Sequence, residues 1–499
     1  MSKICVLKDL LKGFEKYELY GSDNAIISGI EYDSRKIKRG SLFVAVTGFK
    51  IDGNQYIAQA IEKGAAAILT EKYYEHKLPV IVVPEIRTAM SDIAAAFYDN
   101  PADKMQNIAV TGTNGKSSSV YLIKMILKAA GYKAGMLNSL VYDTGNKKYK
   151  AERTTPDSVD IQKYLSEMVQ AGCTYGIIEV SSHALVLQRV RNIKFKIGLF
   201  TNFTRDHLDF HKTMDEYLNA KKLLLKKLSG NDKAAVVNSD VSEFESFTRE
   251  ALCPIIRFSA GNSEADLTVS DVVLGSDQTT FTLNSIYDSS PVKIKLLGRY
   301  NLSNTVGAAA VGLALGFDLA TIARGLGSAE AVSGRFEPVR CGQPFTVLID
   351  YAHTSDAIFR LCQSAKEITK GKILTLFGCG GDRDSGKRPL MGIAASENSD
   401  FCVITSDNPR TEDPDLIIKD ILPGMANNNY EIISDRGEAI ARIISMAQEG
   451  DTVLIAGKGA EDYQEIGTER FPFTDKGEII ASLKKRGYEE VRSDKVELQ

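Results

Sequence analysis

Short apolar runs separated by polar turns mark the first hundred residues of the chain. Buried strands are predicted at the runs 26–27, 41–46, 65–70 and 80–83. Apolar positions at helical spacing over 56–61 predict a helix between two of these strands. The pattern therefore predicts a small α/β domain over residues 1–105.

The middle of the chain has apolar runs that end in polar clusters. The run 107–110 precedes a glycine-containing loop and a helix predicted over 118–130. Further strands are predicted at 175–180, 197–200 and 234–237. Their polar ends indicate a parallel sheet with its ligands at the strand ends. Between 255 and 297, short runs predict a few antiparallel strands, and a helix is predicted over 301–315.

Strand and helix patterns alternate again in the last third of the chain. Strands are predicted at the apolar runs 345–350, 373–377, 401–405 and 452–456. With helical stretches between them, they predict a Rossmann-like domain over 331–499. The central domain, 106–330, then combines a parallel sheet with a small antiparallel sheet. The whole chain is predicted to be an α/β protein of three domains.

Composition agrees with this division and narrows the functional classes. A chain of 499 residues is too long for one core and suits about three domains. The net charge of −3 and the lack of a dense basic run argue against nucleic acid as a partner. No apolar stretch has the length of a membrane span or a signal peptide. Seven scattered cysteines argue against disulfides and a zinc site, so we expect a cytoplasmic protein.

The loop after the 107–110 run has the features of a phosphate-binding loop. Its backbone N–H groups can surround phosphate oxygens because the loop joins a strand to a helix. Lys116 is placed to reach the outer phosphates, and Ser117 to help hold Mg²⁺. The general pattern has a glycine where this chain has Val110. We predict an ATP site here, in a central domain of the P-loop ATPase-like class.

Polar clusters at other strand ends supply further candidate ligands. Glu179 and His183 follow one strand, and a carboxylate and an imidazole beside a phosphate loop suit a divalent ion. Asp350 and His353 follow another strand. The guanidinium of Arg410, after a third strand, suits a carboxylate. One alternative is a nucleotide-binding switch or binding protein without ligase activity, which has no use for Arg410.

Taken together, these motifs resemble the Mur ligases, and in particular the members that add the third residue of the peptide stem. The resemblance spans nearly the whole chain. The matching segments are Thr-Gly-Thr-Asn-Gly-Lys-Ser at 111–117, Glu-Val-Ser-Ser-His at 179–183, Thr-Asn-Phe-Thr-Arg-Asp-His-Leu-Asp at 201–209, Asn-Leu-Ser-Asn at 301–304, Gly-Arg-Phe-Glu at 334–337, Tyr-Ala-His-Thr at 351–354 and Gly-Gly-Asp-Arg at 380–383. The family shares the shortened glycine loop.

The resemblance implies a reaction and its cofactors. ATP would activate the D-glutamate carboxylate of UDP-N-acetylmuramoyl-L-alanyl-D-glutamate as an acyl phosphate, which the amine of a diamino acid then attacks. Lys116, Mg²⁺ and Arg335 would stabilise the developing negative charge. The metal ligands implied are Ser117, Glu179, His183 and Lys221, with Lys221 as a carbamate. We expect a monomer whose partners are these small molecules.

The resemblance also implies the binding residues. For ATP they are Gly112, Thr113, Asn114, Gly115, Lys116, Ser117, Ser118, Asn304, Arg335, Asp350 and His353. For the UDP-sugar peptide they are Ser34, in the first, UDP-sugar-binding domain, and Thr154, Thr155, Ser181 and Arg189. For the amino acid, which the third domain would bind, they are Arg383, Asp407, Asn408, Pro409, Arg410, Gly457 and Glu461.

The choice of amine depends mainly on Arg410. Its guanidinium can pair with the second carboxylate of meso-diaminopimelate, which lysine lacks. We therefore predict diaminopimelate, with a lysine-adding ligase or another Mur or folylpolyglutamate-type ligase as alternatives. The chain departs from the family pattern at Leu187, Ser355 and Ala460.

Overall fold

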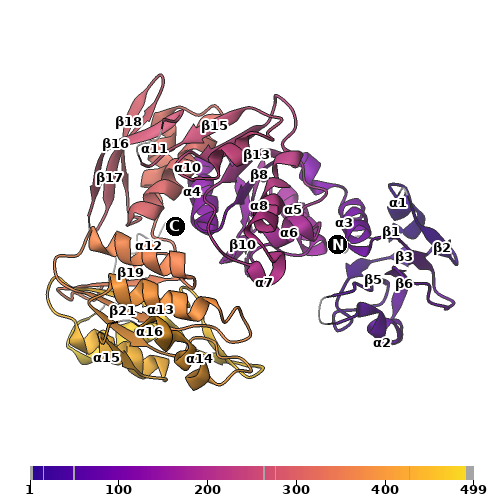
Figure 1. The fold of residues 1–499 in the computed structure, drawn as a ribbon. Helices are drawn as coiled ribbons and strands as arrows, with labels where there is room; N and C mark the ends of the chain where they lie inside the picture. The colour runs from indigo at the N-terminus through magenta and orange to yellow at the C-terminus, as the bar shows by residue number, and fades with distance from the viewer. Residues whose placement is uncertain are drawn as a thin grey trace.

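The computed structural model describes residues 4–14, 16–48, 51–261, 264–275, 277–425 and 427–489. These residues form three large β-sheets with helices packed on them, one sheet in each successive part of the chain (Figure 1). The central part lies between the N-terminal part, drawn in indigo, and the C-terminal part, drawn in orange and yellow. This confirms the predicted multidomain α/β class.

The N-terminal part is built on a five-stranded sheet with the order β2-β7-β6-β5-β4. Its elements are β2 Glu18–Tyr20, β4 Gly29–Glu31, β5 Ser41–Val44, β6 Ala65–Thr70, β7 Val80–Val82, α1 Leu7–Leu11, α2 Ile57–Glu62 and α3 Ile86–Phe97. All neighbours are parallel except β2 and β7. The predicted strand at 26–27 lies outside this sheet, since β3 Ile26–Ile27 pairs with β1 Cys5–Val6.

The central part is built on a sheet in which seven neighbouring strands are parallel. Those strands are β9 Ala134–Leu137, β12 Tyr175–Glu179, β8 Gln106–Thr111, β13 Phe195–Phe200, β14 Ala234–Asn238, β15 Ile255–Phe258 and β16 Leu267–Leu274. Because β12 and β13 flank β8, their carboxyl ends bring the residues after Thr111, Glu179 and Phe200 to one edge. The helices are α4 Lys116–Ala129, α5 Ser158–Gln170, α6 Ser182–Val186, α7 Leu208–His211, α8 Met214–Lys222, α9 Phe244–Thr248, α10 Arg299–Ala314 and α11 Leu319–Gly327.

The predicted antiparallel strands continue this same sheet. They are β16 Leu267–Leu274, β17 Thr279–Ser285 and β18 Ser289–Ile294, joined to β15 where Phe258 pairs with Leu267. The short runs predicted at 268–269 and 272–273 lie on one strand, which has an irregularity beside Asp271. At the opposite edge, β10 Val141–Asp143 and β11 Lys148–Lys150 add an antiparallel pair that the sequence pattern did not predict.

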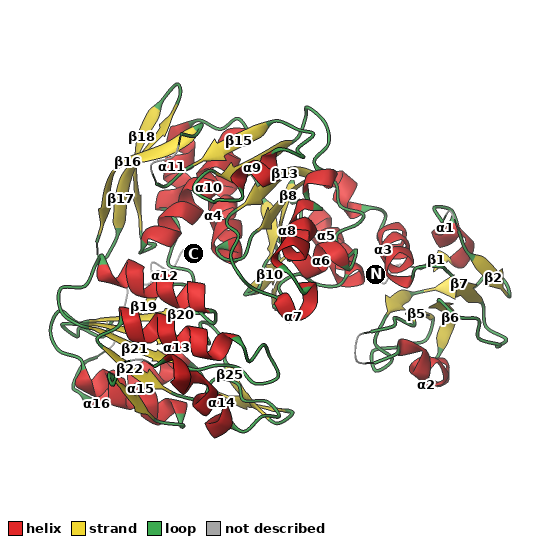
Figure 2. Cartoon of the chain, viewed as in Figure 1, coloured by secondary structure: helices red, strands yellow, loops and turns green. Residues whose placement is uncertain are grey.

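The C-terminal part has a six-stranded sheet with the order β19-β20-β24-β21-β22-β23. Its strands are β19 Glu337–Pro338, β20 Thr346–Asp350, β24 Thr452–Ala456, β21 Ile373–Phe377, β22 Phe401–Ile404 and β23 Tyr430–Ile432. Helices α12 Ser355–Lys366, α13 Lys387–Asn398, α14 Pro414–Ile421, α15 Arg436–Met446 and α16 Asp475–Lys485 accompany them (Figure 2). A separate hairpin joins β25 Tyr463–Ile466 to β26 Glu469–Pro472.

Burial on both faces explains why these strands appear as continuous apolar runs. Along β20, Leu348 packs in one hydrophobic cluster, whereas Val347 and Ile349 pack in a second. Along β24, Leu454 and Val453 divide between the same two clusters. Successive side chains of a strand point to opposite faces, so a sheet covered on both sides needs apolar residues at every position. The predicted strands of this domain are confirmed.

Candidate active site

Glycines allow the loop between β8 and α4 to pack tightly against its neighbours. Gly112 and Gly115 have φ values of +148° and +81°. A Cβ atom on Gly115 would lie 2.0 Å from Oδ1 of Asn304, and one on Gly112 would lie 1.9 Å from Oγ1 of Thr201. Only glycine fits such approaches. The structure thus brings the predicted loop and the predicted ATP residue Asn304 together.

Two lysines meet at this loop. The Lys116 ammonium donates to the carbonyls of Gly112 and Thr113 at 3.1 and 2.7 Å. The Lys221 side chain, on α8, donates to the same Gly112 carbonyl at 2.8 Å and is 1% exposed. Burial, and secondly the charge of Lys116, hold the pKa of Lys221 well below its usual value. The local environment therefore favours a neutral amine at Lys221.

The end of β12 carries the predicted metal ligands beside the loop. The Ser117 hydroxyl donates to Oε2 of Glu179 at 2.8 Å. The ring of His183 lies 4.9 Å from that of His207 and 5.4 Å from that of His211, centroid to centroid. Burial lowers the pKa of His183, which favours the neutral imidazole that binds metals. The Ser117 and Glu179 oxygens therefore lie together beside the phosphate loop, and His183 lies in a separate cluster of imidazoles.

These donors suit a divalent cation. A hydroxyl and a carboxylate oxygen are ligands that Mg²⁺ accepts. The described residues contain no group of three or more His, Cys, Asp and Glu side chains placed to hold a metal. The predicted ligand set contains only two residues of these types, Glu179 and His183. Its other two members are Ser117 and Lys221.

Three of the predicted UDP-sugar residues form one hydrogen-bonded cluster. The Thr155 hydroxyl donates to the Glu179 carbonyl at 2.7 Å and accepts from the Ser181 N–H at 3.0 Å. The Arg189 guanidinium donates to the Thr155 carbonyl at 3.0 Å. Thr154 precedes this cluster in the chain, and Ser34, on the N-terminal part, contacts Gln59 at 2.6 Å.

A contact missed by the sequence analysis joins the N-terminal part to this region. The Tyr32 hydroxyl donates to Oδ2 of Asp160, on α5, at 2.5 Å. Tyr32 lies two residues before Ser34, so this bond places the predicted Ser34 side of the first domain near α5. The two residues are 128 positions apart, and no local pattern signals such a pair.

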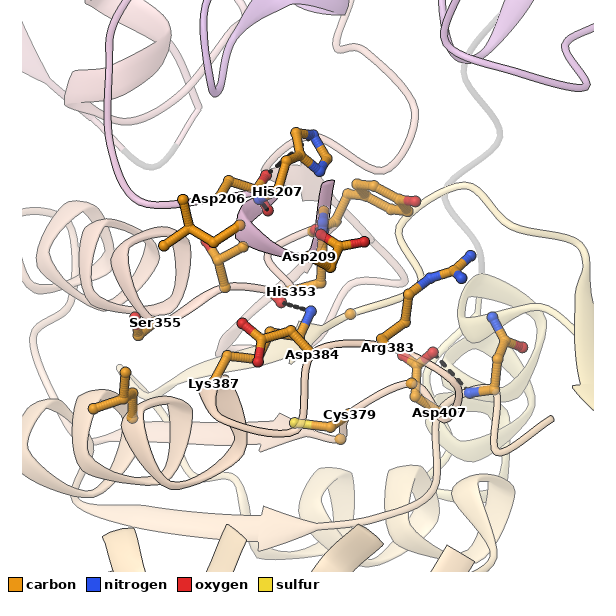
Figure 3. Close-up of a pocket in the computed structure, with 18 of the residues that line it drawn as sticks. Asp206, His207, Asp209, His353, Ser355, Cys379, Arg383, Asp384, Lys387 and Asp407 are labelled. Carbon is orange, nitrogen blue, oxygen red and sulfur yellow. Dashed lines mark hydrogen bonds and ion pairs between the residues drawn. The ribbon is translucent and has the colours of Figure 1, made fainter. Parts of the chain in front are cut away.

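A cavity of about 420 Å³ lies between the central and C-terminal parts (Figure 3). The central part contributes His183 and the segment 205–209, and the C-terminal part contributes His353. Six of the seven predicted amino-acid residues line the same cavity, namely Arg383, Asp407, Asn408, Arg410, Gly457 and Glu461. The seventh, Pro409, does not line it. The cavity therefore joins one predicted metal ligand, His183, to the predicted amino-acid site.

The walls of the cavity include polar residues to which the sequence analysis gave no role. Burial opposes ionisation of Asp206, but His207, His353 and Lys116 together hold the pKa of Asp206 below its usual value. Lys387 donates to the His353 carbonyl at 2.8 Å. Asp206 lies in the strand-end segment 201–209. The sequence therefore marked this segment as a motif but gave Asp206 no role in it.

Arg335 and Asp350 lie where the two parts meet. The Asp350 carboxylate accepts from the Tyr300 hydroxyl of α10 at 2.9 Å and from the Phe336 N–H at 2.8 Å. Burial raises the pKa of Asp350. The Arg335 guanidinium stacks over the Tyr351 ring at 4.5 Å. These contacts hold the predicted Arg335 and Asp350 at the boundary between the two parts.

The predicted amino-acid residues are joined in a polar network. The Asn408 side chain donates to Oε2 of Glu461 at 2.8 Å. Lys458, which is fully buried, donates to Asn408 and Glu461 at 2.9 and 3.0 Å. A Cβ atom on Gly457 would lie 2.5 Å from Oδ2 of Asp407. Lys458 was not predicted and fixes two residues that were.

None of the helices in the described part of the chain combines the length and the apolar character needed to cross a lipid bilayer.

Family models match three successive parts of the chain. The model of the Mur ligase family catalytic domain matches residues 26–98, that of the Mur ligase middle domain matches 110–312, and that of the Mur ligase glutamate ligase domain matches 334–459.

Known proteins match the chain over nearly its full length. The UDP-N-acetylmuramoyl-L-alanyl-D-glutamate–2,6-diaminopimelate ligase of Bacillus cereus is 39% identical and covers 94% of this chain and 96% of its own. The ligase of the same name from Clostridium tetani is 40% identical, covering 96% and 99%. A solved structure of a ligase of this name matches with a TM-score of 0.64 and 32% identity, covering 93% and 96%. The chain therefore belongs to the Mur ligase family.

Proposed function

We propose that this chain is an ATP-dependent ligase that adds meso-2,6-diaminopimelate to UDP-N-acetylmuramoyl-L-alanyl-D-glutamate, a step in peptidoglycan precursor synthesis. The names of its full-length relatives support this proposal. The observation that carries it is the cavity lined by Arg410 on one wall and by His183 and Asp206 on the other, where the Asp206 carboxylate interacts with the charge of Lys116. A carboxylate activated at one wall can meet an amine held at the other.

The proposed division of labour follows the three parts of the chain. Residues 1–105 would bind the UDP-sugar with Ser34, and residues 106–330 would bind ATP and the peptide. Residues 331–499 would bind the amino acid. Thr154, Thr155, Ser181 and Arg189 would complete the UDP-sugar site, where Thr155 is hydrogen-bonded to the Glu179 carbonyl.

The chemistry proposed has two steps. A D-glutamate carboxylate oxygen attacks the γ-phosphorus of ATP, so that ADP leaves and an acyl phosphate forms. The diamino acid's amine then attacks the acyl carbon and loses a proton, and inorganic phosphate leaves as the amide forms. Negative charge develops on oxygen in both steps, so fixed cations lower the barriers. Lys116, beside the loop carbonyls, and Arg335 would supply that charge.

Mg²⁺ fits the donor set beside the loop. Ser117, Glu179, His183 and carbamylated Lys221 would hold it, and the bound ion would neutralise phosphate charge. Carbamylation joins CO₂ to a neutral amine, with loss of a proton, and the burial of Lys221 favours that neutral form. The product is an anion. The carbamate therefore attracts Mg²⁺, whereas the ammonium form of Lys221 would repel it.

Nucleotide recognition would use residues from both sides of the cavity. Asn304, which packs against Gly115, would contact the adenine. The backbone of Gly112 to Gly115, with Ser118, would surround the phosphates. Asp350 and His353 would approach the nucleotide from the C-terminal part.

The choice of amine is proposed to rest on the cationic side chains of the C-terminal wall. Arg410 and Arg383 line the cavity, and guanidinium groups pair well with carboxylates. Diaminopimelate has a carboxylate at its far end and lysine has none. When lysine binds, the Arg410 guanidinium lacks the far carboxylate of the substrate, at a cost of about 1–3 kcal/mol.

The proposal is tested by phosphate release from ATP in the presence of Mg²⁺. We expect release only when the UDP-dipeptide and meso-diaminopimelate are both present, with L-lysine much less effective. Controls omit each substrate in turn. Phosphate release that neither amine stimulates would exclude the ligase function and favour a nucleotide-binding protein of another kind.

A further inference from the structure

The β25–β26 hairpin lies along the segment that lines the amino-acid end of the cavity. The Gln464 side chain donates to the Asp407 carbonyl at 2.8 Å, and the Glu465 N–H donates to Oδ1 of Asn408 at 2.9 Å. The hairpin is therefore attached to Asp407 and Asn408, two of the residues that line the cavity.

The hairpin also holds the backbone of Arg410. The Arg410 N–H donates to the Glu465 carbonyl at 3.0 Å, and the Gly467 N–H donates to the Arg410 carbonyl at 2.7 Å. Arg410 has a φ of +52°, in the left-handed region that residues other than glycine seldom adopt. These two bonds hold it in that conformation, so the direction in which its side chain leaves the backbone depends on the hairpin.

Glu465 fixes the side chain as well. The Arg410 Nε–H donates to Oε2 of Glu465 at 3.1 Å, and Nη1 donates to the Gly381 carbonyl at 2.8 Å. A guanidinium has five N–H groups, and these bonds use two of them. Arg410 lines the cavity and Glu465 does not. Glu465 therefore acts on the cavity through Arg410.

We propose that Glu465 is a positioning residue for amine recognition, which holds the Arg410 guanidinium so that its remaining N–H groups take the far carboxylate of the diamino acid. This inference rests on the function proposed above. A guanidinium already fixed in place loses less side-chain freedom when it binds a carboxylate. Arg410 without Glu465 keeps its charge and loses its orientation.

Steady-state kinetics of full-length variants test the inference. Glu465→Ala is expected to raise the KM for meso-diaminopimelate about tenfold, while kcat and the KM for ATP stay unchanged. Glu465→Gln retains an oxygen that accepts from Nε, so its KM is expected to rise only about twofold. The control is Glu469→Ala, which removes an exposed carboxylate from the same hairpin and leaves the KM at the parent value.

A double variant separates positioning from an independent effect. If Glu465 acts through Arg410, the Arg410→Ala/Glu465→Ala chain has the same KM as Arg410→Ala alone. A parent KM in Glu465→Ala, or additive effects in the double variant, would overturn the inference while the ligase function stands. A parent enzyme that ignores diaminopimelate would overturn both. Circular dichroism and ATP binding identify any variant that fails to fold, and the KM of Glu465→Gln then decides between these outcomes.

Discussion

At the scale of the residue, two lysines donate to one carbonyl, and the charges around them give the two amines different pKa values. Lys116 and Lys221 both donate to the Gly112 carbonyl. Burial lowers the pKa of both amines, but Glu179 and Asp206 oppose this at Lys116, whereas the charge of Lys116 lowers the pKa of Lys221 further. The loop motif in the sequence assigned Lys116 to the phosphates, whereas Lys221 was assigned only through resemblance to a family. Their shared partner follows from the fold, since Lys221 is 109 residues from Gly112.

Replacement of Lys221 tests its proposed carbamate. Lys221→Ala is expected to lower kcat by about a hundredfold or more, because an anionic ligand beside the phosphates is lost. Acetate or formate added in millimolar amounts should restore part of the activity by occupying the vacated space. The control is Lys222→Ala, which removes the neighbouring lysine that pairs with Glu250 at 2.9 Å. Parent-like activity of Lys221→Ala would remove the carbamate from the mechanism.

At the scale of the element, continuous apolar runs predicted the buried strands, whereas the exposed strands have no apolar run and were not predicted. Strands such as β21 and β24 are buried along their whole length, so their apolar runs were correctly predicted. β26 is exposed throughout and β25 is only half-buried, so neither carries an apolar pattern. They form through mutual pairing and through bonds to the 407–410 segment. Glu465 escaped prediction for the same reason.

A buried ion pair holds the ends of two strands beneath the amino-acid site. Arg436, on α15, donates to both carboxylate oxygens of Asp475 at 2.7 and 2.8 Å, and both side chains are 0% exposed. The same guanidinium donates to the carbonyls of Ser406 and Ala456, at 3.4 and 3.0 Å. Those carbonyls immediately precede Asp407 and Gly457 in the chain.

Breaking this pair should destabilise the C-terminal domain. Arg436→Met leaves the Asp475 carboxylate buried without its partner, at an expected cost of about 3–5 kcal/mol. Arg436→Met/Asp475→Leu should recover part of the loss, since no charge is then left unpaired. Urea unfolding followed by circular dichroism measures both. Arg442→Met, which breaks the exposed pair with Glu431, serves as the control with little expected change. An equally small effect of Arg436→Met would contradict the account.

At the scale of the whole molecule, three sequential parts meet through both apolar packing and polar contacts. Val159 of α5 packs in the N-terminal hydrophobic cluster, and Leu297 packs in a C-terminal one. Tyr32 with Asp160 joins the first to the second, while Tyr300 with Asp350 and Lys150 with Asp462 join the second to the third. The α/β class could be predicted because each part has its own apolar pattern. No local pattern signals the interdomain cavity, because its walls come from residues far apart in the chain, most of them polar.

The most direct test identifies the product made when two amines compete. The chain is incubated with ATP, Mg²⁺ and UDP-N-acetylmuramoyl-L-alanyl-D-glutamate, together with equal concentrations of meso-diaminopimelate and L-lysine. Mass spectrometry then identifies the UDP-linked product by its mass. The diaminopimelate tripeptide is expected as the main product. A predominant lysine tripeptide would contradict the role given to Arg410, and no tripeptide at all would contradict the ligase function.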